Sequence, residues 1–470
     1  MLTSAAAMKL AIPALTVLLC GCSAIGPAAD QFYPAHSATQ ERVPVILIPG
    51  LLGSRLVRAK DGVESWPGGT RKLLTSDYLD LALRIDPETL EPLDDGLIPG
   101  GLFDGAVGKD FYRRIVRELR VAGGYHLAKP GQRVVQQRAR LYVFTYDWRQ
   151  DNVQTVRRLD ALIERIRADY GDPQLRVDVV AHSMGGLIAR YYARYGTADV
   201  LDGNSFQVTG HGNAKLRRVV LLGTPNQGTV GAVHKFLNGY RVGISALPIE
   251  GVATMPSTYQ LFPHPLVDWV VNIEGRPLAY DVFDVELWRR YGWSIFDRRV
   301  QRRMDRHRDV WPQQDVFERW FEKKLARARG FAWSLMVPAE PVALVKPLLL
   351  GGDCVPTPRR LVFENIGGES VARLRPEQIL RPAPGVDYER LMFEAGDGSV
   401  TRSSLLSRQD LSREVPRYEQ ESLETQQELF VCAEHNALTS DDALLDALIS
   451  YLLETDPGGM AQPAVDAPAT

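Results

Sequence analysis

The 470-residue chain is poor in cysteine and has no large excess of charge of either sign. It contains four cysteines, and its 55 Lys and Arg residues nearly balance 57 Asp and Glu residues, for a formal net charge of −2. Proteins that bind nucleic acids usually carry a strong basic excess, so we expect no nucleic-acid partner. The cysteine spacing matches neither a disulfide framework nor a metal site, and we expect no metal or other cofactor.

The N-terminal region lacks an apolar run long enough to cross a membrane. The run from Leu10 to Leu19 is too short to span a bilayer core of about 30 Å as a helix. It follows Lys9 and precedes small residues, as in a secretory signal peptide. The segment LCGC (19–22) resembles a bacterial lipobox, which predicts a lipoprotein signal over residues 1–22 and lipidation of Cys22. The alternative is ordinary cleavage near Ala28.

Export follows from either form of the signal. A lipidated chain is expected in the cell envelope, facing the periplasm or in the outer membrane, and an unlipidated chain is expected to be secreted. The exported chain keeps Cys354 and Cys432. The interpretation that we favour leaves these two cysteines unpaired. A disulfide between them in an oxidising compartment stays an alternative, because the sequence does not say whether they lie close together.

Continuous apolar runs predict buried parallel strands in the first half of the chain. They occupy residues 43–54, 141–148, 176–183 and 216–225. Between them, residues 153–171 show apolar side chains at helical spacing, and Gly171 is placed to end that helix. Strands that alternate with amphipathic helices predict an α/β fold with a mostly parallel central sheet, covered on both faces.

The pattern divides the chain into a two-part core with an insertion. We expect a tether over residues 23–42, the first part of the core over 43–225, and the second over 341–455. Residues 226–340 are rich in aromatic residues and arginine and predict a cap over the carboxyl edge of the sheet. Residues 440–454 predict a last helix capped by Ser440. Residues 456–470 predict a disordered tail.

Ser183 lies between a predicted strand and a predicted helix, within AHSMGG (181–186). A nucleophilic serine needs a sharp, rigid turn, and the residues two before and two after it must be small. Ala181 and Gly185 meet that requirement, although Ala181 replaces the usual glycine of the G-x-S-x-G pattern. The alternative is an ordinary turn serine.

A serine nucleophile also needs a base and a carboxylate that orients the base. In this architecture the chain order is serine, acid, histidine, which favours His435 near the end of the core as the base. Asp397, between two glycines, is the favoured acid, and Asp353 is its competitor. We expect His182 to be a packing residue beside the turn rather than a catalytic one.

The oxyanion of an acyl-transfer intermediate needs preorganised N–H donors. We expect them to be the backbone N–H groups of Met184, which follows the nucleophile, and of Leu51, in the loop after the first predicted strand.

Taken together, the motifs resemble the lecithin:cholesterol acyltransferase family. They occur in the family's order: VPVILIPGLLGSRL (43–56), YDWR (146–149), AHSMGG (181–186), LGTPNQG (222–228), PSTYQLFP (256–263), PTPR (356–359), GDGSVTRSSL (396–405) and EHNAL (434–438). The resemblance covers about residues 43–455. It implies an α/β-hydrolase fold with an inserted cap, the triad Ser183, Asp397 and His435, and the oxyanion donors Leu51 and Met184.

The resemblance also implies a reaction. The enzyme would be an O-acyltransferase or phospholipase that takes an acyl chain from a glycerolipid through an acyl-enzyme and passes it to an alcohol or water. Alternatives are a general carboxylester lipase or esterase, and a non-catalytic lipid-binding lipoprotein. The membrane would be met through the lipid anchor and through the cap. Within the cap, the basic segment 297–309 favours a solvated helix. The alternative is that this segment contacts anionic headgroups.

Overall fold

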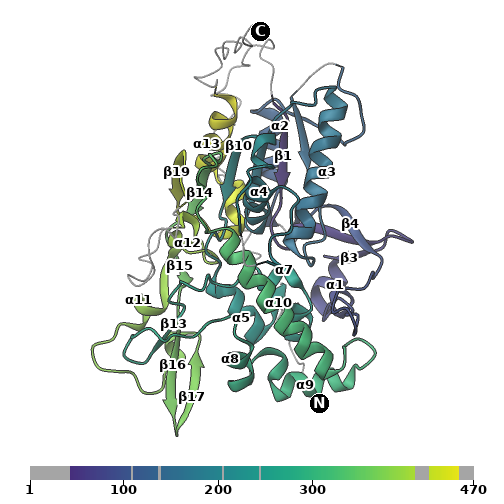
Figure 1. The fold of residues 1–470 in the computed structure, drawn as a ribbon. Helices are drawn as coiled ribbons and strands as arrows, with labels where there is room; N and C mark the ends of the chain where they lie inside the picture. The colour runs from purple at the N-terminus through teal and green to yellow at the C-terminus, as the bar shows by residue number, and fades with distance from the viewer. Residues whose placement is uncertain are drawn as a thin grey trace, which may run out of the picture. The chain divides into compact units, whose positions relative to one another are not determined.

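Seven parallel strands form the central sheet, in the order β19-β14-β10-β9-β1-β8-β7 (Figure 1). The computed structural model describes residues 43–106, 109–135, 139–203, 206–242, 245–407 and 423–454. Cys22 and the predicted signal peptide, tether and tail lie outside these residues. The strands are β1 (Val45–Ile48), β7 (His126–Leu127), β8 (Arg140–Val143), β9 (Val177–His182), β10 (Leu216–Leu222), β14 (Leu348–Gly352) and β19 (Gln427–Val431). The four strands predicted from apolar runs are confirmed, each shorter than its run.

The central strands are buried on both faces because their side chains are apolar on both faces. All residues of β1 and β9 are buried, as expected for parallel strands with helices on either side. Since the strands are parallel, their carboxyl ends meet at one edge of the sheet. The loops after β1, β9 and β19 therefore converge there and carry Leu51, Ser183 and His435. Asp397 lies in the long connection between β14 and β19.

Two pairs of helices cover the two faces of this sheet. The crossovers through α3 (Asn152–Tyr170) and α4 (Met184–Tyr195) run from β8 to β9 and from β9 to β10, towards the β19 end. The connection from β1 through α2 (Arg113–Val121) runs the opposite way. Because such crossovers are right-handed, α2 lies on the other face, where α13 (Asp442–Leu453) packs against it. This arrangement is the α/β-hydrolase fold.

The helix ends follow local capping chemistry. The Asp151 side chain accepts a hydrogen bond from the N–H of Val153 and caps α3, and Gly171 ends this helix in the left-handed conformation, as predicted. The prediction that Ser440 caps the last helix is wrong. Asp441 caps α13 by accepting from the N–H of Leu444, while the Ser440 hydroxyl donates to the carbonyl of Ala437. The Asp441 carboxylate, one residue after Ser440, is the side chain placed to accept from the first turn of α13.

The predicted cap, residues 226–340, is mainly helical. Its elements are α5 (Val230–Asn238), β11 (Tyr240–Val242), β12 (Ser245–Leu247), α6 (Ile249–Ala253), α7 (Pro256–Tyr259), β13 (Val270–Asn272), α8 (Val285–Arg290), α9 (Arg298–Arg306) and α10 (Gln314–Ser334). Its aromatic side chains pack on one another: the rings of Phe236, Phe262 and Phe321 surround the fully buried Trp288. These rings belong to the same hydrophobic core as the side chains of the central sheet, so the predicted cap and the sheet are packed together.

Smaller sheets flank the central one. β13 pairs with β16 (Leu361–Ile366), which pairs with β17 (Glu369–Arg373), so the predicted cap and the second part of the core share a sheet. β15 (Val355–Pro358) pairs antiparallel with β18 (Phe393–Gly396). The remaining elements are β2 (Ser54–Arg58), β3 (Glu64–Trp66), β4 (Leu97–Leu102), β5 (Gly105–Ala106), β6 (Lys109–Asp110), α1 (Thr70–Thr75), α11 (Tyr388–Met392) and α12 (Arg402–Leu406).

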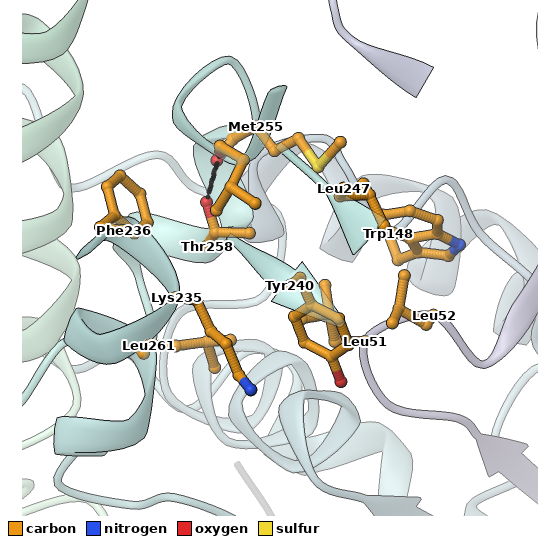
Figure 2. Close-up of a pocket in the computed structure, with 12 residues that line it drawn as sticks. Leu51, Leu52, Trp148, Lys235, Phe236, Tyr240, Leu247, Met255, Thr258 and Leu261 are labelled. Atoms are coloured by element: carbon orange, nitrogen blue, oxygen red, sulfur yellow. Dashed lines mark hydrogen bonds between the residues drawn. The ribbon is translucent and has the colours of Figure 1, made fainter. Parts of the chain in front are cut away.

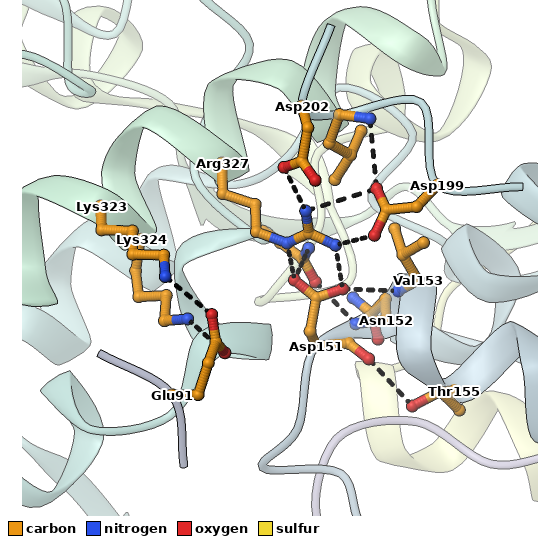
Figure 3. Close-up of polar contacts among 12 residues, drawn as sticks. Glu91, Asp151, Asn152, Val153, Thr155, Asp199, Asp202, Lys323, Lys324 and Arg327 are labelled. Carbon is orange, nitrogen blue, oxygen red and sulfur yellow. Dashed lines mark hydrogen bonds and ion pairs between the residues drawn. The ribbon is translucent and has the colours of Figure 1, made fainter. Parts of the chain in front are cut away.

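Ion pairs fasten α10 to the core (Figure 3). The Arg327 guanidinium contacts Asp151, the capping residue of α3, at 2.7 Å and Asp199 at 2.7 Å, and its side chain is only 16% exposed. Lys323 pairs with Glu91 at 2.8 Å, but both side chains are well exposed. Removing one partner of a buried pair costs about 3–5 kcal/mol, against about 0–1 kcal/mol for an exposed pair. Arg327 is therefore the main electrostatic anchor of α10.

Within the described residues, no helix combines the length and the apolar character needed to cross a membrane.

Candidate active site

Ser183 occupies the turn between β9 and α4, as the sequence predicts. Its φ is 55° and its ψ is −126°, a left-handed conformation that a non-glycine residue adopts only where its surroundings enforce it. The N–H of Ser183 donates to the carbonyl of Leu222 on the neighbouring strand at 2.8 Å. Ser183 is partly exposed although the residues on either side of it are buried. The turn therefore presents the hydroxyl outward on a rigid support.

Glycines allow the backbone to approach this turn closely. A Cβ atom at Gly185 would lie 2.6 Å from the carbonyl oxygen of Ile48, and one at Gly50 would lie 2.7 Å from the Cβ of Ser183. Both distances are shorter than a real Cβ contact. The loop after β1 can therefore touch the serine only because both positions are glycine.

Hydrogen bonds join the three predicted triad residues in one chain. The Ser183 Oγ lies 2.9 Å from Nε2 of His435, and Nδ1 of His435 lies 2.7 Å from Oδ2 of Asp397. An ionised carboxylate can only accept, so Nδ1–H donates to Asp397. This leaves Nε2 free to accept the serine proton, which is the tautomer that a general base requires.

The Asp397 carboxylate is held by several donors. Its Oδ1 accepts from the N–H groups of Ser399 at 2.9 Å and Val400 at 2.7 Å, and its backbone carbonyl accepts from the N–H of His435 at 2.8 Å. Burial by itself raises the pKa of Asp397. The charge and hydrogen bond of His435 and the two N–H donors outweigh it and hold the pKa below its usual value. Asp397 is therefore ionised at neutral pH.

Asp353, the competing acid, lies apart from the base. It follows β14, its carboxylate is 32% exposed, and it faces Arg402 at 3.7 Å. No hydrogen bond joins it to His435 among the described residues. The acid that the structure places beside the base is Asp397. Asp397 follows β18, which lies in the small sheet with β15. A late strand of the main fold would instead belong to the central sheet.

Cys354 and Cys432 form a disulfide, and the expectation that they are unpaired is wrong. Their Cα atoms are 5.1 Å apart, although 78 positions separate them in the sequence. Gly352 pairs with Val431 at the ends of β14 and β19, so both cysteines leave the sheet at adjacent points. The bond ties the strand that leads to His435 to the strand beside Asp397, because Val355 forms a bridge with Asp397.

The predicted oxyanion donors, Leu51 and Met184, lie on either side of Ser183. Leu51 follows Gly50, which packs on the serine, and Met184 begins α4 directly after it. Within the described residues, neither backbone N–H donates a hydrogen bond to another group. Both donors are therefore available to a substrate oxygen.

A buried relay that sequence reasoning missed links the Leu51 loop to the base. The N–H of Gly50 donates to the Tyr112 oxygen at 2.8 Å, and the Tyr112 hydroxyl donates to Nδ1 of His182 at 2.7 Å. Nε2–H of His182 then points to the carbonyl of His435 at 3.3 Å. Burial lowers the pKa of His182 to about 3, so this ring stays neutral. Tyr112 is 70 positions from His182, and no local pattern announces the contact.

An apolar cavity opens beside the Leu51 loop (Figure 2). Its volume is about 30 Å³, which is too small for an acyl chain, so lining side chains must move apart to admit one. The residues that line it are Leu51, Leu52, Trp148, Ala232, Lys235, Phe236, Tyr240, Leu247, Val252, Met255, Thr258 and Leu261. Most come from the predicted cap, and Leu51, Leu52 and Trp148 come from the predicted first part of the core.

The family resemblance is confirmed over part of the chain. Residues 126–319 match the lecithin:cholesterol acyltransferase family model. This range includes Ser183 and most of the predicted cap, and it ends before Asp397 and His435. No curated protein sequence matches the chain.

Several solved structures align with this chain over most of its length. The Tle4–Tli4 complex has a chain that is 16% identical over 87% of this chain and 98% of its own length, with a TM-score of 0.52. Mature Bacillus licheniformis lipase BlEst2 is 13% identical over 89% of this chain and 95% of its own, with a TM-score of 0.34. Clostridium botulinum EstA is 12% identical over 89% and 88%, with a TM-score of 0.33. The first of these likenesses agrees with the α/β-hydrolase topology described above.

We predict that Asp397→Asn lowers kcat for ester hydrolysis by about 10⁴-fold, as mis-oriented histidines do in comparable triads. The new Oδ1 can still accept from Ser399 and Val400, so the loop should keep its shape. The new amide cannot accept from Nδ1–H of His435. Asp353→Asn is the matched control and should leave kcat within a few-fold of wild type. If Asp353→Asn is the crippling change, the acid is misassigned.

Proposed function

We propose that this protein is a serine enzyme that takes an acyl group from a glycerolipid ester and passes it to an alcohol or to water. The hydrogen-bonded chain from Ser183 through His435 to Asp397 is the observation that carries the proposal. The apolar cavity beside Leu51 and the match to the acyltransferase family over residues 126–319 support a lipid as substrate.

In the first step, Ser183 attacks the carbonyl carbon of the ester. Its proton passes to Nε2 of His435, and Asp397 stabilises the imidazolium that forms. The carbonyl oxygen becomes an oxyanion, which accepts hydrogen bonds from the N–H groups of Leu51 and Met184. Loss of one such donor lowers the rate by about 10²–10³-fold. The contact that holds the Leu51 loop against Ser183 therefore affects the rate of acyl transfer.

In the second step, the intermediate collapses and His435 gives its proton to the departing alcohol. The acyl-enzyme on Ser183 is then attacked by an acceptor hydroxyl, whose proton His435 removes. The bond between Ser183 Oγ and the acyl carbon breaks as His435 returns this proton to Oγ. An alcohol gives a new ester and water gives a free acid, so the outcome depends on which of them reaches the acyl-enzyme. The small apolar cavity favours a site from which bulk water is displaced when a chain enters.

The same triad would also serve a general carboxylester lipase or esterase, which is the second candidate function. A non-catalytic lipid-binding protein is disfavoured, because it would not need the strained serine turn or the base in its reactive tautomer. The alternatives differ in their products, so product analysis separates them.

We also propose that the protein binds to the surface of a membrane. On α9, Arg298, Arg299, Arg302 and Arg306 are exposed and have no carboxylate partner among the described residues, whereas Arg303 pairs with the buried Glu250. The exposed basic face suits anionic headgroups. The predicted lipid on Cys22 would add a second anchor, and two weak anchors together hold a protein at a membrane.

The anchor has a direct test. Protein made in a bacterial envelope should enter the detergent phase, and Cys22→Ala should move it to the aqueous phase. The change should leave ester hydrolysis by the purified enzyme intact, because Cys22 lies outside the catalytic segments. Wild-type protein in the aqueous phase would rule out lipidation.

The central prediction concerns acyl partition. Purified protein with an acyl-labelled phospholipid and a long-chain alcohol, diacylglycerol or sterol should yield labelled acylated acceptor, and Ser183→Ala should yield none. Mostly free fatty acid, lost in the same variant, would assign a phospholipase or lipase instead. Equal product from Ser183→Ala would contradict the proposed function.

A further inference from the structure

Lys235 is the charged residue among the side chains that line the cavity. It lies on α5, and its ammonium group sits 4.7 Å from the centre of the Tyr240 ring (Figure 2). Most of the other lining residues are apolar. Lys235 is partly buried, and its positive charge is set against these apolar side chains.

Other enclosed cations of the protein have hydrogen-bond acceptors: the Arg194 guanidinium donates to the carbonyl of Ser334, and three further cations pair with carboxylates. Arg149 pairs with Asp147 and Asp95, Arg327 with Asp151 and Asp199, and Lys324 with Glu91. Lys235 differs from them. Among the residues that the structure describes, its Nζ has neither a carboxylate nor a hydrogen-bond acceptor, and only the Tyr240 ring offsets its charge.

The neighbours of Lys235 do not neutralise it. His234, next to it on α5, is largely buried, and burial together with the charges of Lys235 and Arg375 lowers the pKa of His234 to about 4. His234 is therefore neutral at pH 7. Burial also lowers the pKa of Lys235 from its usual value, with no opposing acid. An anion that enters the cavity would meet a cation that is short of a partner.

The helix that carries Lys235 is fixed to the catalytic loop. Thr229 caps α5, and its Oγ1 donates to the carbonyl of Ser399 at 2.6 Å. Ser399 in turn donates its N–H to Asp397. At the other wall of the cavity, Leu51 follows the glycine that packs on Ser183. The cation, the oxyanion loop and the acid loop are thus held in one frame around the cavity.

We propose that Lys235 binds the phosphate of a glycerophospholipid donor and so sets the preference of the site for phospholipids over neutral glycerides. This inference rests on the proposed function and names its donor class. In a glycerophospholipid, an anionic phosphate lies a few bonds from the scissile ester. The proposal requires this phosphate to pair with the ammonium group while the ester carbonyl lies at Ser183. A diacylglycerol or triacylglycerol would leave the charge unpaired, and a site discriminates against a ligand that leaves its polar group unmatched.

The test compares two donors that share the same acyl chains, phosphatidylglycerol and diacylglycerol, each in neutral detergent micelles. Lys235→Met keeps the length of the side chain and removes its charge. It should lower kcat/KM for phosphatidylglycerol by about 10- to 100-fold, as expected for a lost hydrogen bond to a charged group. Turnover of diacylglycerol and of a soluble p-nitrophenyl ester should fall by much less, and the readout is the ratio of the kcat/KM for phosphatidylglycerol to the kcat/KM for diacylglycerol. Lys235→Arg should recover part of the preference.

A matched control separates this effect from general charge. Lys323→Met removes one positive charge from the exposed face of α10 and should leave the donor ratio at the wild-type value. If Lys235→Met leaves the ratio unchanged while turnover still depends on Ser183, the inference fails and the proposed function stands. If it lowers all three activities equally, Lys235 has a structural role and the inference also fails.

Binding to the Ser183→Ala variant tests the inference even if no turnover is found. Short-chain dihexanoyl phosphatidic acid should bind to this variant and lose affinity about 10-fold or more when Lys235→Met is added. Inorganic phosphate is the second probe. Weak binding of inorganic phosphate, insensitive to Lys235, supports a lipid phosphate as the ligand. Binding of inorganic phosphate as tight as that of the lipid would assign the site to free phosphate and overturn the lipid assignment.

Discussion

The left-handed conformation of Ser183 is the constraint on which the rest of the site depends. It turns the chain from β9 into α4 within one residue, and it persists because the β1 loop packs against it through Gly50 and Gly185. The same contact sets the predicted oxyanion donor Leu51 beside the nucleophile. This one packing contact therefore fixes both the serine hydroxyl and the N–H groups that would donate hydrogen bonds to the oxyanion.

The base and the acid are held by a second, separate frame. Asp397 and His435 are joined by both a side-chain and a backbone hydrogen bond, and the Cys354–Cys432 disulfide ties the strand that leads to His435 to the strand beside Asp397. The buried relay through Tyr112 and His182 then links this frame to the serine loop. A hydrogen bond from Thr229 to Ser399 joins α5, which carries Lys235, to the acid loop as well.

Local patterns in the sequence predicted the features that local forces decide. Apolar runs predicted the strands, helical spacing and Gly171 predicted α3, and small residues around Ser183 predicted the turn. Features that depend on distant contacts were missed or misjudged. The disulfide needed the pairing of β14 with β19, and the relay needed Tyr112 to reach His182 across the fold. Asp397 was ranked above Asp353 by its flanking glycines, but only the fold shows that Asp397 is the aspartate hydrogen-bonded to His435.

The most direct test of the central claim is to find which atom reacts. A fluorophosphonate with a long alkyl chain should label the folded protein once, and mass spectrometry of the digested protein should place the adduct on Ser183. Labelling should be slowed by phospholipid and abolished by prior unfolding, because free serine hydroxyls are poor nucleophiles. An adduct on another residue, or labelling that survives unfolding, would contradict the account of an activated serine in a preorganised site.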